Sequence, residues 1–359
     1  MDDVFIALDK ITKQLPKRKT YIRNVKKINY GDVILSPLKV PFDIPPNNQS
    51  SMDGIGVKNK GKFFTIKGKT YLNKIKKVSL SKNECLIVKT GSLIPNEIKY
   101  IIPVERLIKN NNTYDVLNYD FKNKYIRTKG HIFKKNQNIK VKKEFLSLKD
   151  LITIKSINKL NVKVQSKLRF KIIATGSEFT SNHFIHPTNS DYIEKTITKY
   201  RQIVDENVHI IDNQKRIDQE INNSKSDITI IIGGTGKSED DIKFNNYKLE
   251  INGLDLKPGR PFKFFSKSNK LYLFFPGNPC SSFVLTNILL KSIINKYCFH
   301  NERLEKVTFD IKDIRNNFKK LVRKTFLFGN IKDKDLIILK NQESSNISNL
   351  LNSNCLVYY

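Results

Sequence analysis

The sequence predicts a multidomain α/β protein, and three observations lead to that prediction. The chain has 359 residues, which is more than one hydrophobic core usually organises. Residues 228–232 form a short apolar run rich in β-branched side chains, as is typical of a buried parallel strand. From residue 169 to residue 300 such runs alternate with helical patterns, which is typical of a doubly wound sheet.

Composition indicates a soluble, cytoplasmic protein. The hydrophobic fraction is 39%, which is enough for a globular core. The chain has no run of eighteen apolar residues, and Asp2 and Asp3 near its start do not fit a signal peptide, so we expect no membrane partner. The four cysteines lack metal-ligand or redox spacing, so we expect reduced, structural side chains at Cys85, Cys280, Cys298 and Cys355.

The net charge of +31 raises the question of a nucleic-acid partner. The lysines are spread along the whole chain beside many isoleucines and asparagines, which indicates a general compositional bias. No zinc-finger spacing, aromatic RNA-binding motif or concentrated basic tail is present. We therefore expect no nucleic-acid partner, and a basic protein also suits an anionic small molecule.

The amino-terminal part predicts a helix and then a loop with functional potential. Helical spacing over residues 4–15 ends at Pro16. A proline-rich loop over 41–46 leads to the small-residue turn 50–54, which presents the carboxylate of Asp53. A capping aspartate in an ordinary turn is an equally common reading of this pattern.

The remaining patterns divide the chain into further units. Residues 56–127 contain short alternating runs that predict a β-module, and a helix is expected over 146–152. The predicted units are a discontinuous amino-terminal domain (1–36 and 130–165), an inserted β-module (37–129), an α/β domain (166–300) and a small carboxyl-terminal β domain (301–359).

Within the α/β domain, strands and helices are expected to alternate. The predicted strands are 170–174, 208–212, 228–232 and 271–275, and the predicted helices are 190–202, 214–222 and a long one after Pro279. The tail is expected to contain strands at 307–311 and 336–339.

Three of these strands run into small, polar loops at 175–178, 233–241 and 276–279. The carboxyl ends of parallel strands meet at one edge, where open α/β sheets bind ligands. Glycine backbone approaches an anion closely, and the acidic residues after Gly236 suit Mg²⁺. The alternative is an ordinary glycine turn before a solvated acidic face. A P-loop is rejected, because position 231, where its first glycine is required, is isoleucine.

Taken together, the loops resemble the motifs of the molybdopterin molybdenumtransferase family, whose members insert molybdate into adenylylated molybdopterin and release AMP. The resemblance covers residues 4 to 359, and six motifs occur in the family's order. They are Ser50-Ser51-Met52-Asp53-Gly54, Thr90-Gly91 with Pro95, Thr175-Gly176-Ser177-Glu178, Gly233-Gly234 with Asp241, Lys257-Pro258-Gly259-Arg260-Pro261 and Pro276-Gly277-Asn278-Pro279.

The resemblance implies roles for individual residues. Catalytic roles fall on Asp53, Thr90, Glu178, Asp241 and Lys257, and Mg²⁺ would be held by Asp53, Glu178 and Asp241. Pterin- and phosphate-binding positions are Gly233, Gly234, Ser238, Arg260, Pro276, Gly277, Asn278 and Pro279, with the backbone N–H groups of the three glycines meeting phosphate. The resemblance also implies a homodimer, in which Asp53 and Thr90 act across the interface.

The sequence departs from the family pattern at several positions. Acidic residues are replaced at His131, Ile132 and Ser177, and Phe328 stands where arginine is usual. Residues 235–238 are closer to the G-G-T-G loop of the related adenylyltransferase domains. Two alternatives therefore remain, namely a molybdopterin adenylyltransferase and a non-catalytic protein that binds molybdopterin or the cofactor.

Overall fold

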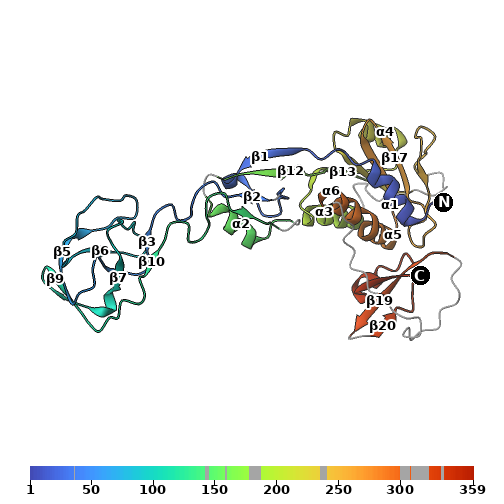
Figure 1. Cartoon of the computed structure of the whole chain (residues 1–359). Helices are drawn as coiled ribbons and strands as arrows, with labels where there is room; N and C mark the ends of the chain where they lie inside the picture. Colours follow the sequence, from blue (N-terminus) through green and yellow to red (C-terminus); the bar gives the residue numbers. More distant parts are fainter. Residues whose placement is uncertain are drawn as a thin grey trace.

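The computed structural model describes residues 1–35, 37–141, 145–157, 160–177, 187–234, 241–299, 308, 323–332 and 335–359. Figure 1 shows an elongated arrangement, in which a β-module and an α/β unit occupy opposite ends. A slender region that contains β1, β12, β2 and α2 lies between them, and a small sheet with β19 and β20 adjoins the α/β unit. The predicted multidomain α/β class is confirmed.

The α/β unit is built on a six-stranded sheet with the order β14-β13-β15-β18-β17-β16. Its four parallel strands are β14 (Ile203–Ile210), β13 (Arg169–Thr175), β15 (Ile228–Gly233) and β18 (Lys270–Pro276). Two antiparallel strands, β17 (Lys263–Lys267) and β16 (Ile251–Asn252), extend one edge. The central strand is fully buried, as predicted.

Strand β14 begins earlier than expected, and its position in the sheet explains why. The residues missed by the apolar pattern include Glu206, which pairs with the ammonium group of Lys171 on β13 at 2.6 Å. Because β14 is an edge strand, such a charged side chain reaches solvent and is tolerated there.

Helices cover both faces of the sheet. One face packs against α1 (Val4–Lys13), α3 (Thr188–Lys199), α5 (Pro279–Leu285) and α6 (Lys291–Phe299), and the other face packs against α4 (Gln214–Asn223). A π-helical turn, Thr286–Leu290, joins α5 to α6. Alternate side chains of β15 enter opposite cores, so that Ile230 and Ile232 face one core and Ile231 faces the other. The sheet is therefore doubly wound.

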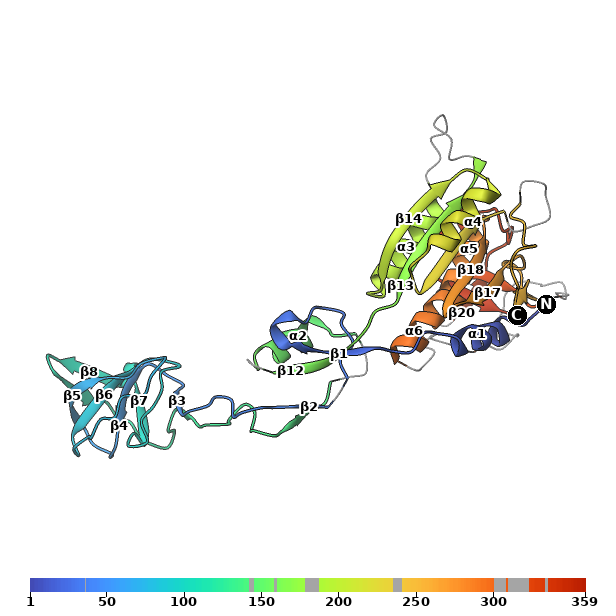
Figure 2. The same ribbon diagram turned by 90° about the horizontal axis from the view of Figure 1, so that it is seen from above.

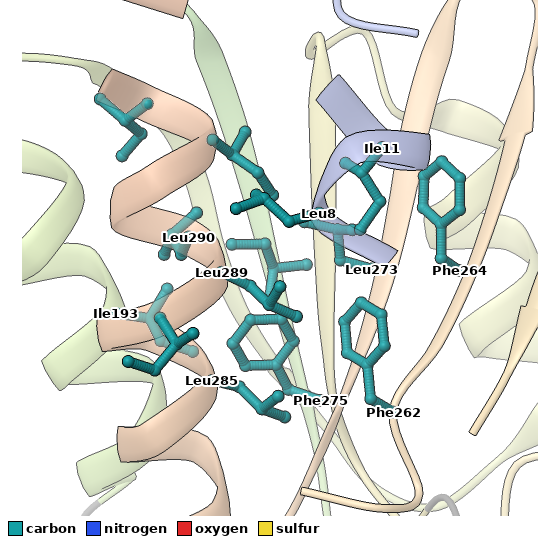
Figure 3. Close-up of a cluster of buried hydrophobic side chains, with 14 of the residues drawn as sticks. Leu8, Ile11, Ile193, Phe262, Phe264, Leu273, Phe275, Leu285, Leu289 and Leu290 are labelled. Atoms are coloured by element: carbon teal, nitrogen blue, oxygen red, sulfur yellow. The ribbon is translucent and has the colours of Figure 1, made fainter. Parts of the chain in front are cut away.

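Helix α1 belongs to the core of the α/β sheet. Asp3 caps it by accepting a hydrogen bond from the Phe5 N–H at 2.8 Å. Leu8 and Ile11 are buried beside Leu273 and Leu289 (Figure 3). The sequence analysis grouped residues 1–36 with 130–165, whereas the packing places this helix with residues 168–299. The domain boundaries themselves stay predictions.

The slender region has a small core of its own. Its elements are β1 (Thr20–Asn24) paired with β12 (Asn161–Gln165), β2 (Leu38–Lys39) paired with β11 (Asn138–Ile139), the 3-10 turn Val25–Lys27 and α2 (Leu148–Lys155). Ser147 and Asp150 form a capping box that sets the start of α2.

The β-module contains a second six-stranded sheet, with the order β7-β4-β6-β5-β9-β8. Its strands are β4 (Gly54–Val57), β5 (Phe63–Lys69), β6 (Glu84–Val88), β7 (Tyr100–Pro103), β8 (Leu107–Asn110) and β9 (Thr113–Val116), with a 3-10 turn at Val104–Arg106. The short pair β3 (Gln49–Ser50) and β10 (Ile126–Arg127) joins it to the slender region (Figure 2).

The carboxyl-terminal sheet contains β19 (Phe326–Lys332), β20 (Asp335–Ile338) and β21 (Cys355–Tyr358), with α7 (Ser348–Asn352) beside it. The strand expected at 307–311 lies outside the described residues. The amino terminus contacts this sheet, because Asp3 pairs with Lys324 and the Phe5 ring packs on Tyr358 with centroids 5.4 Å apart. All four cysteines are free, and no helix among the described residues could span a membrane.

Candidate functional site

The loops that follow β13, β15 and β18 meet at the carboxyl edge of the sheet. The N–H of Gly277 donates to the carbonyl of Gly233 at 2.9 Å. A Cβ atom on Gly233 would lie 2.1 Å from Oγ1 of Thr175. This approach is possible only because position 233 has no side chain, so the glycine permits three strand ends to converge.

Thr175 is a buried polar residue in this junction that the sequence analysis noted only as part of a motif. Its side chain is 6% exposed, and its hydroxyl has no hydrogen-bond partner in the part of the chain that the structure describes. The hydroxyl fills the space beneath Gly233.

Asp241 lies against the second glycine of the loop. A Cβ atom on Gly234 would lie 2.3 Å from Oδ1 of Asp241, and the N–H of Ile242 donates to the Gly234 carbonyl at 2.9 Å. The chain therefore returns to the sheet edge after residues 235–240 and places one carboxylate there. Carboxylate oxygens at this position have the chemistry that Mg²⁺ prefers.

The loop at residues 276–279 differs from one expectation. Its Gly277 N–H is already donated to Gly233, so it is not available to a phosphate in this structure. Asn278 caps α5, accepting a hydrogen bond from the Ser281 N–H at 3.4 Å, and Pro279 is the first helical residue. Pro276 is the last residue of β18 and is buried.

Lys257 lies where the α/β unit meets the carboxyl-terminal sheet. Its N–H donates to the Lys324 carbonyl at 3.0 Å, and its carbonyl accepts from the Phe326 N–H at 2.8 Å. A pocket of about 530 Å³ adjoins it, lined by Lys257, Lys340, Asn341, Gln342 and Glu343. The lining combines two lysines with one glutamate, and this excess of positive charge favours an anionic ligand.

The sequence analysis did not identify residues 340–343, because they follow β20 without any motif. Gln342 fixes this segment on β19. Its side-chain oxygen accepts from the Phe328 N–H at 2.9 Å, and its amide donates to the Phe328 carbonyl at 3.0 Å. Phe328 is itself buried, and its ring centroid lies 6.1 Å from that of Phe283.

Arg260 is exposed and lies against the start of the chain. Its Nε donates to Sδ of Met1 at 3.3 Å. The predicted anion-binding role of this guanidinium group therefore stays a prediction.

Asp53 and Thr90 are brought together in the β-module, before β4 and after β6. Oδ1 of Asp53 accepts from the Thr90 N–H at 2.6 Å and from the Thr90 hydroxyl at 2.8 Å. These bonds, the backbone one foremost, hold the pKa of the exposed Asp53 carboxyl below its usual value. Gly54 has a φ of +150°, and a Cβ atom there would lie 2.0 Å from the Ile102 carbonyl oxygen.

Within one chain this pair is far from the α/β loops. The β-module and the α/β unit lie at opposite ends in both views (Figures 1 and 2). Glu178 and Ser238 lie outside the described residues. Among the described residues no three His, Cys, Asp or Glu side chains gather around a possible metal position. The Mg²⁺ site from Asp53, Glu178 and Asp241 therefore stays a prediction.

Comparison with known protein families shows which class of protein has this fold and these loops. Residues 171–296 match the family model described as "Probable molybdopterin binding domain", and residues 3–157 match "MoeA N-terminal region (domain I and II)". The α/β unit is thus of the molybdopterin-binding class, and it follows the amino-terminal region typical of MoeA proteins. The chain belongs to the MoeA family, and the predicted resemblance is confirmed.

Curated relatives agree with this assignment. The chain is similar to a molybdopterin molybdenumtransferase from Synechocystis, with 25% identity over 281 residues that cover 71% of each protein. It is similar to a protein of the same name from Haemophilus influenzae, with 24% identity over 313 residues that cover 81% of this chain and 76% of that one.

Two solved structures show the same fold along the whole chain. Both are molybdopterin biosynthesis MoeA proteins from Pyrococcus horikoshii. One has a TM-score of 0.76 at 17% identity and covers 99% of this chain and 94% of that one. The other has a TM-score of 0.70 at 21% identity and covers 100% and 95%.

Proposed function

We propose that this protein is a molybdopterin molybdenumtransferase, which inserts molybdate into adenylylated molybdopterin and releases AMP. The observation that carries the proposal is the convergence of three loops at one edge of the molybdopterin-binding-type sheet, where Gly277 bonds to Gly233 and Gly233 covers Thr175. The family membership and the relatives named molybdopterin molybdenumtransferase support it.

Two cationic side chains of the α/β unit, from the segment 257–261, suit the charge changes of the reaction. Release of AMP breaks a phosphoanhydride bond, and negative charge then grows on the departing phosphate oxygen. Fixed cations stabilise such a transition state more than covalent catalysis does. Lys257 would supply one cation from the α/β unit and Arg260 a second, with bidentate geometry available to the guanidinium group.

We further propose that the protein works as a homodimer. Asp53 and Thr90 form a bonded pair on an exposed loop of the β-module, but in one chain this module lies at the opposite end from the α/β loops. A second copy would bring its Asp53 and Thr90 to the site. Mg²⁺ would then be held by carboxylates from both copies, Asp241 and Asp53 among them, and would neutralise phosphate charge when bound.

The experiment that tests the function is AMP release. Purified protein is incubated with adenylylated molybdopterin and Mg²⁺, with and without molybdate. We expect AMP release that depends on molybdate. Adenylyl transfer from ATP to molybdopterin would show an adenylyltransferase instead, and tight binding of molybdopterin without turnover would show a binding protein.

A further inference from the structure

A side chain outside the recognised motifs holds the loop of residues 276–279 in place. Asn189, in the first turn of α3, donates from its side-chain amide to the carbonyl of Gly277 at 2.6 Å. The N–H of the same glycine donates to Gly233 at 2.9 Å. Both polar groups of Gly277 are therefore engaged, and Asn189 provides the contact on the carbonyl side.

Asn189 can act as a clamp, meaning a side chain that holds the Gly277 carbonyl in place, because its own position is fixed. The hydroxyl of the neighbouring Ser190, which is 1% exposed, donates to the Pro187 carbonyl at 3.0 Å. Its oxygen also lies 3.0 Å from Nε2 of His209 on β14. The start of α3 is thus tied to the edge strand of the sheet.

Packing fixes α3 relative to α5 as well. The rings of Tyr192 and Phe283 stack with centroids 5.1 Å apart. The next residue, Ile193, lies in the same buried cluster as Leu285 (Figure 3). A contact made from the first turn of α3 is therefore made from a rigid support.

The direction of this contact matters for a site that binds anions. A carbonyl oxygen carries partial negative charge, so an unpaired one beside phosphate or molybdate oxygens opposes binding. A donor that occupies the Gly277 carbonyl removes this repulsion and prevents rotation of the peptide group towards the ligand. The flanking residues Pro276 and Pro279 restrict the loop further.

We infer that Asn189 is a positioning residue for the phosphate-bearing pterin substrate. It holds the Gly277 peptide so that the loop presents no free carbonyl oxygen to the ligand. This inference rests on the proposed function for the identity of the ligand, but the clamp itself is a property of the free protein.

Hydrogen–deuterium exchange tests the clamp without any ligand. Prolines have no N–H, so the segment Pro276–Pro279 contains only two exchangeable amides, those of Gly277 and Asn278. In Asn189→Ala we expect the Gly277 amide, which donates to Gly233, to exchange at least about tenfold faster than in the wild type, because the loop opens locally. The matched control is Asn207→Ala, which removes an amide contact of equal length, 2.6 Å to Glu194 on α3, away from the loop. It should leave the exchange of residues 277 and 278 unchanged.

Binding of molybdopterin, measured by calorimetry on the same variants, tests the consequence. We expect Asn189→Ala to weaken binding by about fivefold to tenfold, the scale of one hydrogen bond, and Asn207→Ala to leave it unchanged. Equal exchange in the two variants would overturn the clamp, and faster exchange with wild-type affinity would overturn the positioning role. Wild-type protein that binds no molybdopterin would instead count against the proposed function, while the exchange result would still decide whether the clamp exists.

Discussion

The most specific structural prediction concerns the space at Gly233. In Gly233→Ala the new methyl group would lie 2.1 Å from Oγ1 of Thr175. Thr175 is 6% exposed and belongs to the central sheet, so neither residue can move aside freely. Overpacking of this kind costs about 1–3 kcal/mol.

A matched control and a rescue variant separate the clash at Gly233 from other effects of adding a methyl group. A Cβ atom on Gly277 would lie 3.6 Å from its nearest neighbours, which is ordinary contact. Gly277→Ala should therefore change stability by no more than about 1 kcal/mol, in either direction. In a Thr175→Ala background the clash partner is removed, so Gly233→Ala should cost less there than in the wild type, by about 1–2 kcal/mol of coupling energy.

Urea unfolding followed by circular dichroism at helical wavelengths measures these differences. Among the described α-helices only α2 packs into a different core, that of the slender region, so the helical signal reports chiefly on the unit that contains the substitutions. Equal stability of Gly233→Ala and Gly277→Ala would refute the reasoning, as would additive costs in the double variant. Either result would mean that the strand ends do not converge as described.

Three further predictions follow from the charged groups. Asp241→Asn should lower molybdate-dependent AMP release by about a hundredfold, with less than about 0.5 kcal/mol lost in stability. The control Asp212→Asn, at an exposed position of the same unit, should have little effect on AMP release. Equal, small effects of the two substitutions would make Asp241 a solvated turn residue. Thr90→Val should raise the pKa of Asp53 in a carbon-detected NMR titration, because the hydroxyl hydrogen bond is lost. Since the folded-state pKa of Asp53 is lowered, the stability that this pair contributes is present above the ordinary aspartate pKa of about 3.9. That stability is lost as the pH falls through the folded-state pKa. An unchanged pKa of Asp53 in Thr90→Val would show that the hydroxyl has no part in lowering it. Binding to duplex DNA should be weak, without sequence preference, and should collapse as salt rises, and sequence-selective binding at physiological salt would contradict the small-molecule assignment.

The sequence predicted β13, β15 and β18 because each contains a short apolar run, but it predicted only the end of β14, whose first residues include charged side chains. It did not predict β16 and β17. Strand β17 has only two buried residues, Phe264 and Phe265, which is too short a pattern to separate from a loop. The hairpin that joins it to β18 turns at Ser268 and Asn269, with φ of +52° and +61°. This turn lacks the Asn-Gly or Asp-Gly pair that usually marks such a hairpin.

The site was predictable only where a strand end carried a motif. The glycine loops were located correctly because strand ends of a parallel sheet share one edge. Asn189 and Lys340 were missed, since each lies in a segment with no distinctive spacing. Tertiary packing alone brings Asn189 to the Gly277 loop and Lys340 to the pocket beside Lys257. The distance between the Asp53 pair and the α/β loops depends on how the units are arranged along the molecule (Figure 1), which local patterns do not encode.

Complementation between two variants tests the central claim, that one molybdate-insertion site combines loops from two copies of this chain. Asp53→Asn and Lys257→Gln should each abolish most AMP release on their own. If the site is shared, each mixed dimer contains one site in which both residues are intact. Mixing equal amounts of the two variants makes roughly half of the dimers mixed, so roughly a quarter of wild-type activity should be restored. If Asp53 and Lys257 serve the same site from one chain, or if Asp53 has no part in the site, the mixture will show no more activity than the average of the two variants.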